Sequence, residues 1–239
     1  MVTGATGAIG QVVVEQFIQN GDFVVGTYSG NLEKARELES LYNKDRAALG
    51  MKKLNITDKN EMNEFISCVV EEYGRIDVLI NNAGITRDQF FATMSDGEWN
   101  DVIQTNLIGT LNMSLKVLKI MKKNNFGRIV NVSSVSGVFG RETQINYSLT
   151  KGGIIGITQL LNKFVMNYNI IINCVAPGMI STEMVKKVES KKIKSFLNYV
   201  SEKRMGEPEE IAEAVFWLAS NKSAYLSSTV IHADGGFAK

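Results

Sequence analysis

Short apolar runs rich in β-branched residues alternate along this chain with segments of helical periodicity, and this alternation limits the possible folds more than any other feature. The apolar runs are DFVVGTY (residues 22–28), RIDVLIN (75–81), GRIVNVS (127–133), NIIINCVA (169–176) and SSTVIHA (227–233). Strands that alternate with helices predict a parallel sheet covered by helices on both faces. We therefore expect an α/β fold with a doubly wound parallel sheet of about seven strands, forming a single domain over residues 1–239.

Two of the helical segments also carry boundary signals. In residues 57–74, Thr57 or Asp58 can cap the amino end, Gly74 can end the helix, and the apolar residues between them recur at helical spacing. A later helix is expected to begin at Pro208, which stands beside acidic residues in its first turn.

The composition excludes several functional classes. The chain has 239 residues, 44% of them hydrophobic, and 26 basic against 25 acidic side chains give a formal charge of +1. A nearly neutral chain has no overall field that would recruit nucleic acid or an anionic membrane, so we expect neither as a partner. Cys68 and Cys174 are isolated and have no histidine cluster beside them, so the sequence predicts neither a disulfide framework nor a metal site.

The amino-terminal sequence MVTGATGAIG lacks the basic start and apolar run of a signal peptide, and no stretch reaches the roughly 18 apolar residues of a membrane span. We expect a cytoplasmic protein. If a glycine-rich loop begins at Gly4, only Met1 to Thr3 remain for the first strand, whereas strands usually contain about five or six residues. Either residues are missing before Met1 or a short first strand is tolerated.

A glycine-rich loop follows this first strand. The sequence TGATGAIG, from Thr3 to Gly10, leads directly into apolar residues at helical spacing. Glycine permits a tight turn and a close approach of the backbone to a pyrophosphate, while a helix amino terminus offers N–H groups and a positive dipole end. The loop indicates a dinucleotide site; a plain glycine-rich turn is the alternative.

The end of the second predicted strand bears on the choice of dinucleotide. Proteins that bind NAD often carry an acidic residue there, which holds the ribose hydroxyls. This chain has Thr27, Tyr28 and Ser29 instead, with Lys34 and Arg36 not far beyond. Without a carboxylate to repel a 2′-phosphate, NADP is favoured over NAD.

Polar residues follow two further predicted strands. The motif NNAG, residues 81–84, comes after VLI, and Ser133, Ser134 and Ser136 come after GRIVNV. The carboxyl ends of parallel strands meet at one edge of a sheet, where doubly wound sheets bind their ligands. An asparagine-rich turn and serines that bond only to loop backbone are the alternatives.

Tyr147 and Lys151 stand four residues apart in the stretch NYSLTKGG, residues 146–153. At helical pitch such positions share one face, with Cβ atoms roughly 5 to 6 Å apart. Lowering the pKa of a tyrosine from about 10 to about 7 requires on the order of 4 kcal/mol. One ammonium group about 4 Å away, at an effective dielectric constant near 20, supplies roughly that much. We therefore expect Lys151 to lower the pKa of Tyr147.

In combination, these motifs resemble those of the short-chain dehydrogenase/reductase family. The glycine loop, NNAG, the QTNL stretch at residues 104–107, a serine thirteen residues before a tyrosine, and the Y-x-x-x-K spacing occur together. The resemblance covers essentially the whole chain and implies a Rossmann-like fold. It is closest to bacterial 3-oxoacyl-(acyl-carrier-protein) reductases, through VLINNAGITRD, INYSLTKGGIIGIT and NCVAPGMISTEM.

The resemblance implies four catalytic residues. Tyr147 is the acid that protonates a carbonyl oxygen, Lys151 binds the nicotinamide ribose, and Ser134 holds the substrate carbonyl in line for hydride transfer. Asn106 holds a water that relays protons to Lys151; the alternative is an asparagine bonded to nearby backbone. Since the sole histidine, His232, has no evident triad partner, serine-hydrolase chemistry is not expected.

The resemblance also assigns contacts to NADP(H), which include Tyr147 and Lys151. The other positions are Gly4, Ala5, Thr6, Gly7 and Gly10 at the pyrophosphate, Thr27 at the adenosine phosphate, Asn55 and Ile56 at the adenine, Asn82, Ala83 and Gly84 at the ribose, and Pro177, Gly178, Ile180 and Thr182 at the nicotinamide end. The family usually has glycine where Ala8 stands, so we expect cofactor binding with reduced affinity.

The implied activity is the NADPH-dependent reduction of a 3-oxoacyl thioester to the 3-hydroxyacyl thioester in fatty-acid or polyketide-type biosynthesis, with the acyl group on acyl carrier protein or coenzyme A. The alternatives are another short-chain alcohol or sugar dehydrogenase, and a non-catalytic NADP-binding scaffold or sensor. The family also implies a substrate lid at residues 179–206 and a homotetramer. Within that lid, the lysines of residues 186–194 are expected at a solvated surface or, alternatively, at a phosphate of the substrate carrier.

Overall fold

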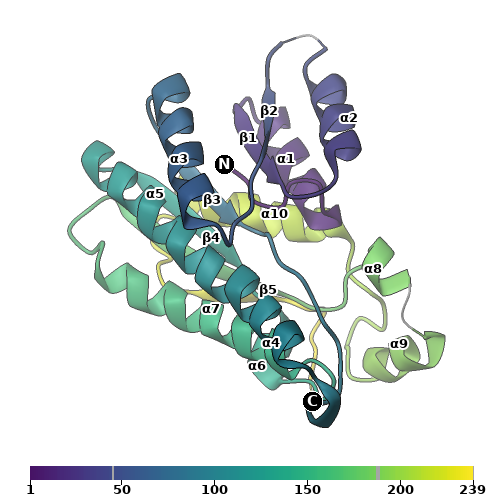
Figure 1. Ribbon diagram of the computed structural model, residues 1–239. Helices are drawn as coiled ribbons and strands as arrows, with labels where there is room; N and C mark the ends of the chain where they lie inside the picture. The colour runs from purple at the N-terminus through teal and green to yellow at the C-terminus, as the bar shows by residue number, and fades with distance from the viewer. Residues whose placement is uncertain (45, 187–188, 239) are drawn as a thin grey trace.

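The computed structural model describes residues 1–44, 46–186 and 189–238, and its strands lie side by side in a parallel sheet (Figure 1). The paired strands within these ranges are β1 (Val24–Tyr28), β2 (Leu49–Lys53), β3 (Val78–Asn81), β4 (Gly127–Val132), β5 (Ile170–Pro177) and β6 (Val230–Ala233). Strand β1 pairs with β2, and β3, β4, β5 and β6 pair in that order, all in parallel register. Of the run SSTVIHA (227–233), only the last four residues form a strand, β6.

Val2 joins the two groups of strands. It forms parallel bridges with Gly26 of β1 and Ile80 of β3, so the short first strand lies in the centre of the sheet. The Val2 amide donates to the Val25 carbonyl at 2.9 Å, and the Ile80 amide donates to the Met1 carbonyl at 2.9 Å. The chain leaves this centre toward β1 on one side and β3 on the other, which is the switch point where doubly wound sheets bind ligands.

The described helices lie on both sides of the sheet. Their bounds are α1 (Ala8–Gln19), α2 (Leu32–Tyr42), α3 (Lys59–Tyr73), α4 (Asp96–Val102), α5 (Thr110–Asn124), α6 (Val135–Phe139), α7 (Ile145–Lys163), α8 (Glu183–Lys186), α9 (Ser190–Leu197) and α10 (Pro208–Ala219), with two short 3-10 helices, η1 (Phe91–Thr93) and η3 (Asn221–Ser223), and a π-helix, η2 (Ile103–Gly109). Both sequence-predicted helix boundaries are confirmed: the Asp58 side chain caps α3, Gly74 ends it with φ of 77°, and α10 begins at Pro208.

Alternating strand residues face two separate apolar cores. Leu79 and Ile129 pack with α3, α5 and α7, whereas the next residues, Ile80 and Val130, pack with α1 and α10 on the opposite face (Figure 1). Successive side chains of a strand point to opposite faces, so near-continuous apolar strands are buried on both sides. The expected Rossmann-like, doubly wound fold is therefore confirmed.

The segment expected to form a lid contains α8 and α9 and the loops around them. Residues 187 and 188 lie outside the described residues, so the expectation for Lys187 is not addressed by the structure. In the part of the chain that is described, no helix combines the length and apolar character needed to cross a membrane.

Candidate active site

The glycine loop and the NNAG motif are joined by hydrogen bonds at the carboxyl edge of the sheet. The Thr3 hydroxyl accepts from the amides of Asn82 and Ala83 at 3.0 and 3.1 Å. The Asn82 side chain donates to the carbonyls of Thr3 and Gly4, both at 3.1 Å. Asn82, expected at a ribose, therefore directs its amide nitrogen to the loop backbone and fixes the loop's shape.

The glycine loop is packed too closely for side chains at two positions. A Cβ on Gly10 would lie 2.3 Å from the Gly4 carbonyl oxygen, and one on Gly4, whose φ is +64°, would lie 2.9 Å from Ala83 Cα. Ala5 between them is buried, and the Thr6 carbonyl accepts from Gln11 at 2.8 Å. Glycine at these two positions therefore lets the loop pack closely against the start of α1 and against the NNAG segment.

Helix α1 begins directly after this loop. Gly7 is its N-cap residue, and among the described residues no side chain caps that end. The first N–H groups of a helix have no partner within the helix and attract anions. Gly7 and the half-buried Ala8 thus lie where a pyrophosphate would be held.

Ser134 and Tyr147 meet at the end of β4. Ser134 is the N-cap residue of α6, and its hydroxyl accepts from the Ser136 amide at 3.1 Å. Burial raises the pKa of the Tyr147 phenol to about 12, although a hydrogen bond with Ser134 acts to lower that pKa. Asp88 raises the pKa further and Arg141 lowers it. The phenol is therefore protonated at neutral pH.

Lys151 lies beside Tyr147 but does not set its pKa. The Lys151 ammonium is buried, donates to the Val132 carbonyl at 2.8 Å and lies 5.5 Å from the centre of the Tyr147 ring. Desolvation lowers the pKa of Lys151 to about 8. The pKa of Tyr147 is thus raised, not lowered to about 7 as expected, because burial dominates the shift and Lys151 is not among the groups that offset it.

Asn106 lies in the π-helix η2 and is fully buried. Its side chain accepts from the Ile85 amide at 2.8 Å, donates to the Ile85 carbonyl at 2.9 Å and donates to the Thr150 hydroxyl at 3.3 Å. Ile85 is 21 residues away in sequence, so Asn106 does not bond to the nearby helix backbone that the sequence left as the alternative. Short π-helical segments are frequent at functional sites, and the sequence pattern gave no signal for this one.

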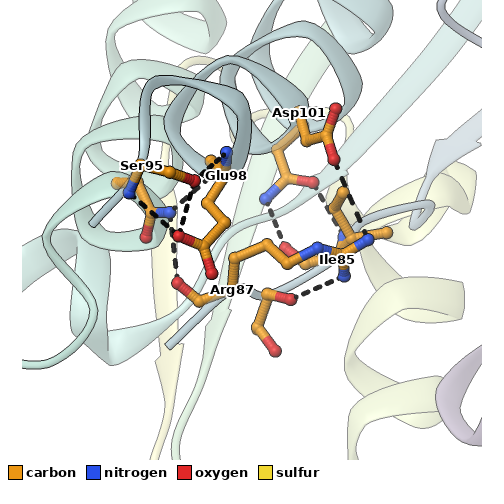
Figure 2. Close-up of polar contacts among 8 residues, drawn as sticks. Ile85, Arg87, Ser95, Glu98 and Asp101 are labelled. Carbon is orange, nitrogen blue, oxygen red and sulfur yellow. Dashed lines mark hydrogen bonds and ion pairs between the residues drawn. The ribbon is translucent and has the colours of Figure 1, made fainter. Parts of the chain in front are cut away.

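The loop after β3 is held from both sides, as Figure 2 shows. Beyond Ile85, the Arg87 carbonyl accepts from the Asn146 side chain at 3.2 Å, and the Arg87 guanidinium lies 4.0 Å from the Asp101 carboxylate. Ser95 and Glu98 form a capping box at the start of α4. The loop between NNAG and α4 is thus fixed beside the amino end of α7.

Gly84 separates the polar groups of Asn106 and Lys151. A Cβ at Gly84 would lie 3.3 Å from the Asn106 side-chain oxygen and 3.5 Å from the Lys151 ammonium nitrogen. Both groups therefore border the same small space. The structure thus brings Asn106 and Lys151 together at Gly84, while Tyr147 lies next to both Lys151 and Ser134.

Thr27 does not reach the end of its strand. It is only 3% exposed, its amide donates to the Val2 carbonyl and its carbonyl accepts from the Ala5 amide. The first exposed hydroxyl beyond β1 belongs to Ser29. Ser29 is therefore better placed than Thr27 for an adenosine phosphate. Lys34 forms an ion pair with Glu37 at 3.0 Å.

Asn55 and Ile56 follow β2. Asn55 is exposed, and its side-chain oxygen accepts from the Thr57 amide at 3.1 Å. Ile56 is buried, and a Cβ on Gly109 would lie 3.1 Å from it. Only Asn55 of this pair is freely accessible to a ligand.

The segment after β5 also lies at this edge. Pro177 ends β5, and the Gly178 amide donates to the Ala233 carbonyl at 2.9 Å. Ile180 is buried and forms a parallel bridge with Gly206, while Thr182 is half-buried. Across the described ranges, no group of three or more His, Cys, Asp or Glu residues is placed to hold a metal ion.

A doubly wound parallel sheet with a tight glycine loop at its switch point defines the Rossmann-like class of α/β proteins. The family model for short chain dehydrogenases matches residues 1–193. The chain belongs to the short-chain dehydrogenase family of oxidoreductases.

Curated relatives match over nearly the whole chain. The 3-oxoacyl-(acyl-carrier-protein) reductase FabG of Haemophilus influenzae is 39% identical over 236 residues, covering 99% of this chain and 96% of the relative. The protein of the same name from Thermotoga maritima is 40% identical over 239 residues, with coverage of 99% and 96%. That of Escherichia coli K12 is 36% identical, with coverage of 99% and 95%.

Proposed function

We propose that this protein reduces a 3-oxoacyl thioester to the 3-hydroxyacyl thioester with NADPH, in fatty-acid or polyketide-type biosynthesis. The observation that carries the proposal is the meeting of Tyr147, Ser134 and Lys151 at the carboxyl edge of the sheet, next to the glycine loop. The names of the relatives support the substrate class. The acyl group is carried on acyl carrier protein or coenzyme A.

The loop geometry fits a dinucleotide. Close backbone packing at Gly4 and Gly10 and the α1 amino terminus suit a pyrophosphate, and Ser29 offers a hydroxyl to a 2′-phosphate with no carboxylate on the strand end. Lys151 would hold the nicotinamide ribose. The reduced nicotinamide supplies a hydride to the substrate carbonyl carbon.

Tyr147 supplies the proton. Because its pKa is about 12, the phenol is protonated at neutral pH and can donate to the carbonyl oxygen as negative charge develops there. The Ser134 hydroxyl donates a second hydrogen bond to the same oxygen and orients the carbonyl. The charge of Arg141 acts to stabilise the resulting tyrosinate, and the Lys151 ammonium lies 5.5 Å from the centre of its ring.

Asn106 and Lys151 would return a proton to Tyr147. The Asn106 oxygen and the Lys151 ammonium nitrogen both lie next to Gly84, and a water that bridges these two groups would relay the proton. Asn106 also fixes the Ile85 backbone and so positions the loop that borders this space. Its proposed role is thus positional as well as proton-relaying.

We also propose the domain organisation and assembly expected from the family: one catalytic domain over residues 1–239, a substrate lid at 179–206, and a homotetramer. Exposed apolar side chains on α7 support the assembly, since Leu149 is 51% exposed and Leu160 is 52% exposed. Figure 1 shows α7 beside α5 at one side of the molecule. The cytoplasmic location stays a prediction.

The proposed function is tested by following NADPH absorbance with acetoacetyl-coenzyme A and with an acetoacetyl group on acyl carrier protein, and by repeating both with NADH. Turnover with NADPH in preference to NADH supports the proposal. Turnover of simple alcohols or sugars without thioester reduction would favour another dehydrogenase. NADPH binding without turnover of any carbonyl compound would favour a scaffold or sensor.

A further inference from the structure

A pocket of about 220 Å³ lies between α6, α9 and the carboxyl-terminal segment. Four aromatic side chains line it, those of Phe139, Phe196, Tyr199 and Phe237. The rings of Phe196 and Phe237 stack with centroids 4.8 Å apart, and the Phe139 ring lies 5.3 Å from that of Phe237. Stacked aromatic rings form a rigid apolar wall.

This pocket adjoins the proposed reaction centre. Ser136 lines it, and the Ser136 amide donates to the Ser134 hydroxyl at 3.1 Å. Arg141, at another side of the pocket, is close enough to Tyr147 to act on the phenol electrostatically. A substrate carbonyl held by Ser134 and Tyr147 would therefore have one of its substituents directed toward the pocket.

The cationic groups of the pocket already have partners. The Arg141 guanidinium lies over the Phe196 ring, 5.9 Å from its centroid, and the Lys192 ammonium lies 3.7 Å from the Glu189 carboxylate. Neither the Arg141 guanidinium nor the Lys192 ammonium is therefore an unpartnered charge in the pocket. The aromatic lining favours an apolar occupant over an anionic one.

Phe237 is fixed in place by the backbone around it. Phe237 forms an antiparallel bridge with Val200, and the Ala238 amide donates to the Tyr199 carbonyl at 2.8 Å. The Phe237 amide also donates to the Asp234 carboxylate at 3.3 Å. The carboxyl-terminal segment is therefore tied to the residues just after α9, and the Phe237 ring is held in the wall.

We propose that this pocket binds the distal, apolar end of the acyl chain and limits its length, an inference that rests on the proposed function. An apolar cavity of about 150 Å³ accommodates benzene, which has six heavy atoms, so a pocket of about 220 Å³ accommodates a chain of at least about seven heavy atoms. With the first three carbons at the reaction centre, an acyl group of about ten carbons fits this pocket. Ser195, Phe196 and Phe237 determine this limit.

The test compares two identical substitutions on α9. Ser195 lines the pocket, whereas Ser190, at the start of the same helix, does not. Wild type, Ser195→Phe and the control Ser190→Phe are assayed with NADPH and the 3-oxobutanoyl and 3-oxodecanoyl thioesters of coenzyme A. Calorimetric titration with butanoyl- and decanoyl-coenzyme A measures binding without turnover.

Wild type is expected to favour the ten-carbon substrate in kcat/KM, because each methylene in an apolar pocket contributes roughly tenfold. Ser195→Phe should lower the ten-to-four-carbon ratio of kcat/KM, and the corresponding ratio of affinities, by at least about tenfold. Ser190→Phe should leave both ratios unchanged. Equal ratios in wild type and Ser195→Phe would overturn the pocket assignment while thioester reduction stands. Absence of thioester turnover in wild type, with decanoyl binding still lost in Ser195→Phe, would overturn the proposed reaction and keep the pocket.

Discussion

The Lys151 ammonium lies 5.5 Å from the centre of the Tyr147 ring and donates a hydrogen bond to the Val132 carbonyl at 2.8 Å. Both side chains come from α7, and both are shifted in pKa by burial: Lys151 downward to about 8, Tyr147 upward to about 12. The pair is thus a cation and a neutral phenol at neutral pH. Protonation states suited to carbonyl reduction are therefore already present.

The buried charge of Lys151 should appear in the pH dependence of stability. Because the pKa falls from 10.5 unfolded to about 8 folded, the unfolded chain binds more protons between these pH values. The wild-type free energy of unfolding, measured relative to Lys151→Met, should rise by roughly 3 kcal/mol from pH 8 to pH 10.5. Denaturant titrations at several pH values measure it, with the exposed Lys163→Met as the control. A flat difference would show that Lys151 is not desolvated.

Gly84→Ala should impair catalysis more than folding. The added methyl lies 3.3 Å from the Asn106 oxygen, which must shift by a few tenths of an ångström, and 3.5 Å from the Lys151 nitrogen, where it places an apolar group in contact with the ammonium. We expect kcat to fall about 10- to 100-fold with little change in Tm. Gly97→Ala in α4, where a Cβ meets only Ser95 at 3.9 Å, is the control. Wild-type kcat in Gly84→Ala would exclude a role for that space.

Asn106→Leu should destabilise the protein. It leaves the Ile85 amide and carbonyl without their side-chain partner, and each buried unpaired group costs about 1–3 kcal/mol. We expect a loss of roughly 2–4 kcal/mol in the free energy of unfolding. Thr150→Val, which removes the longer 3.3 Å contact to Asn106, should cost less. Equal losses in the two variants, measured by urea denaturation, would argue against Asn106 as the main support of this loop.

Ser29→Asp should change the cofactor preference. A carboxylate at the exposed end of β1 repels a 2′-phosphate and accepts from a free 2′-hydroxyl. We expect the NADPH-to-NADH ratio of kcat/KM to fall at least about tenfold, the equivalent of roughly 1.4 kcal/mol. Thr27→Val, at the buried position, should keep the wild-type ratio. If the NADPH-to-NADH ratio changed in Thr27→Val but not in Ser29→Asp, Thr27 and not Ser29 would be the residue at the adenosine phosphate.

The parts of the fold that follow from local periodicity could be predicted from the sequence. Five apolar runs correspond to β1, β3, β4, β5 and β6, and Asp58 and Gly74 bound α3 as expected. Strand β2 was missed because its sequence, LGMKK, is only partly buried at the sheet edge and has no continuous apolar run. Edge strands carry this weaker signal.

The sequence could name the candidate site residues, but it could not predict where their side chains point or how deeply they are buried. The sequence indicated Asn82 and Thr27 as ligand contacts, yet the Asn82 side chain bonds to the glycine loop and Thr27 is buried in β1. The pKa of Tyr147 depends on its burial, which spacing on a helix does not reveal. The aromatic pocket combines Phe139, Phe196 and Phe237, which are distant in sequence, so no local pattern could indicate it.

The central claim is that Tyr147 is the proton donor in the reduction of a 3-oxoacyl thioester. The most direct measurement compares NADPH oxidation by wild type and Tyr147→Phe with acetoacetyl-coenzyme A, alongside the NADPH affinity of each, with Tyr168→Phe as a control. We predict that Tyr147→Phe lowers kcat by about 10²- to 10⁴-fold while NADPH affinity stays near that of wild type. Turnover by Tyr147→Phe at close to the wild-type rate would contradict the account.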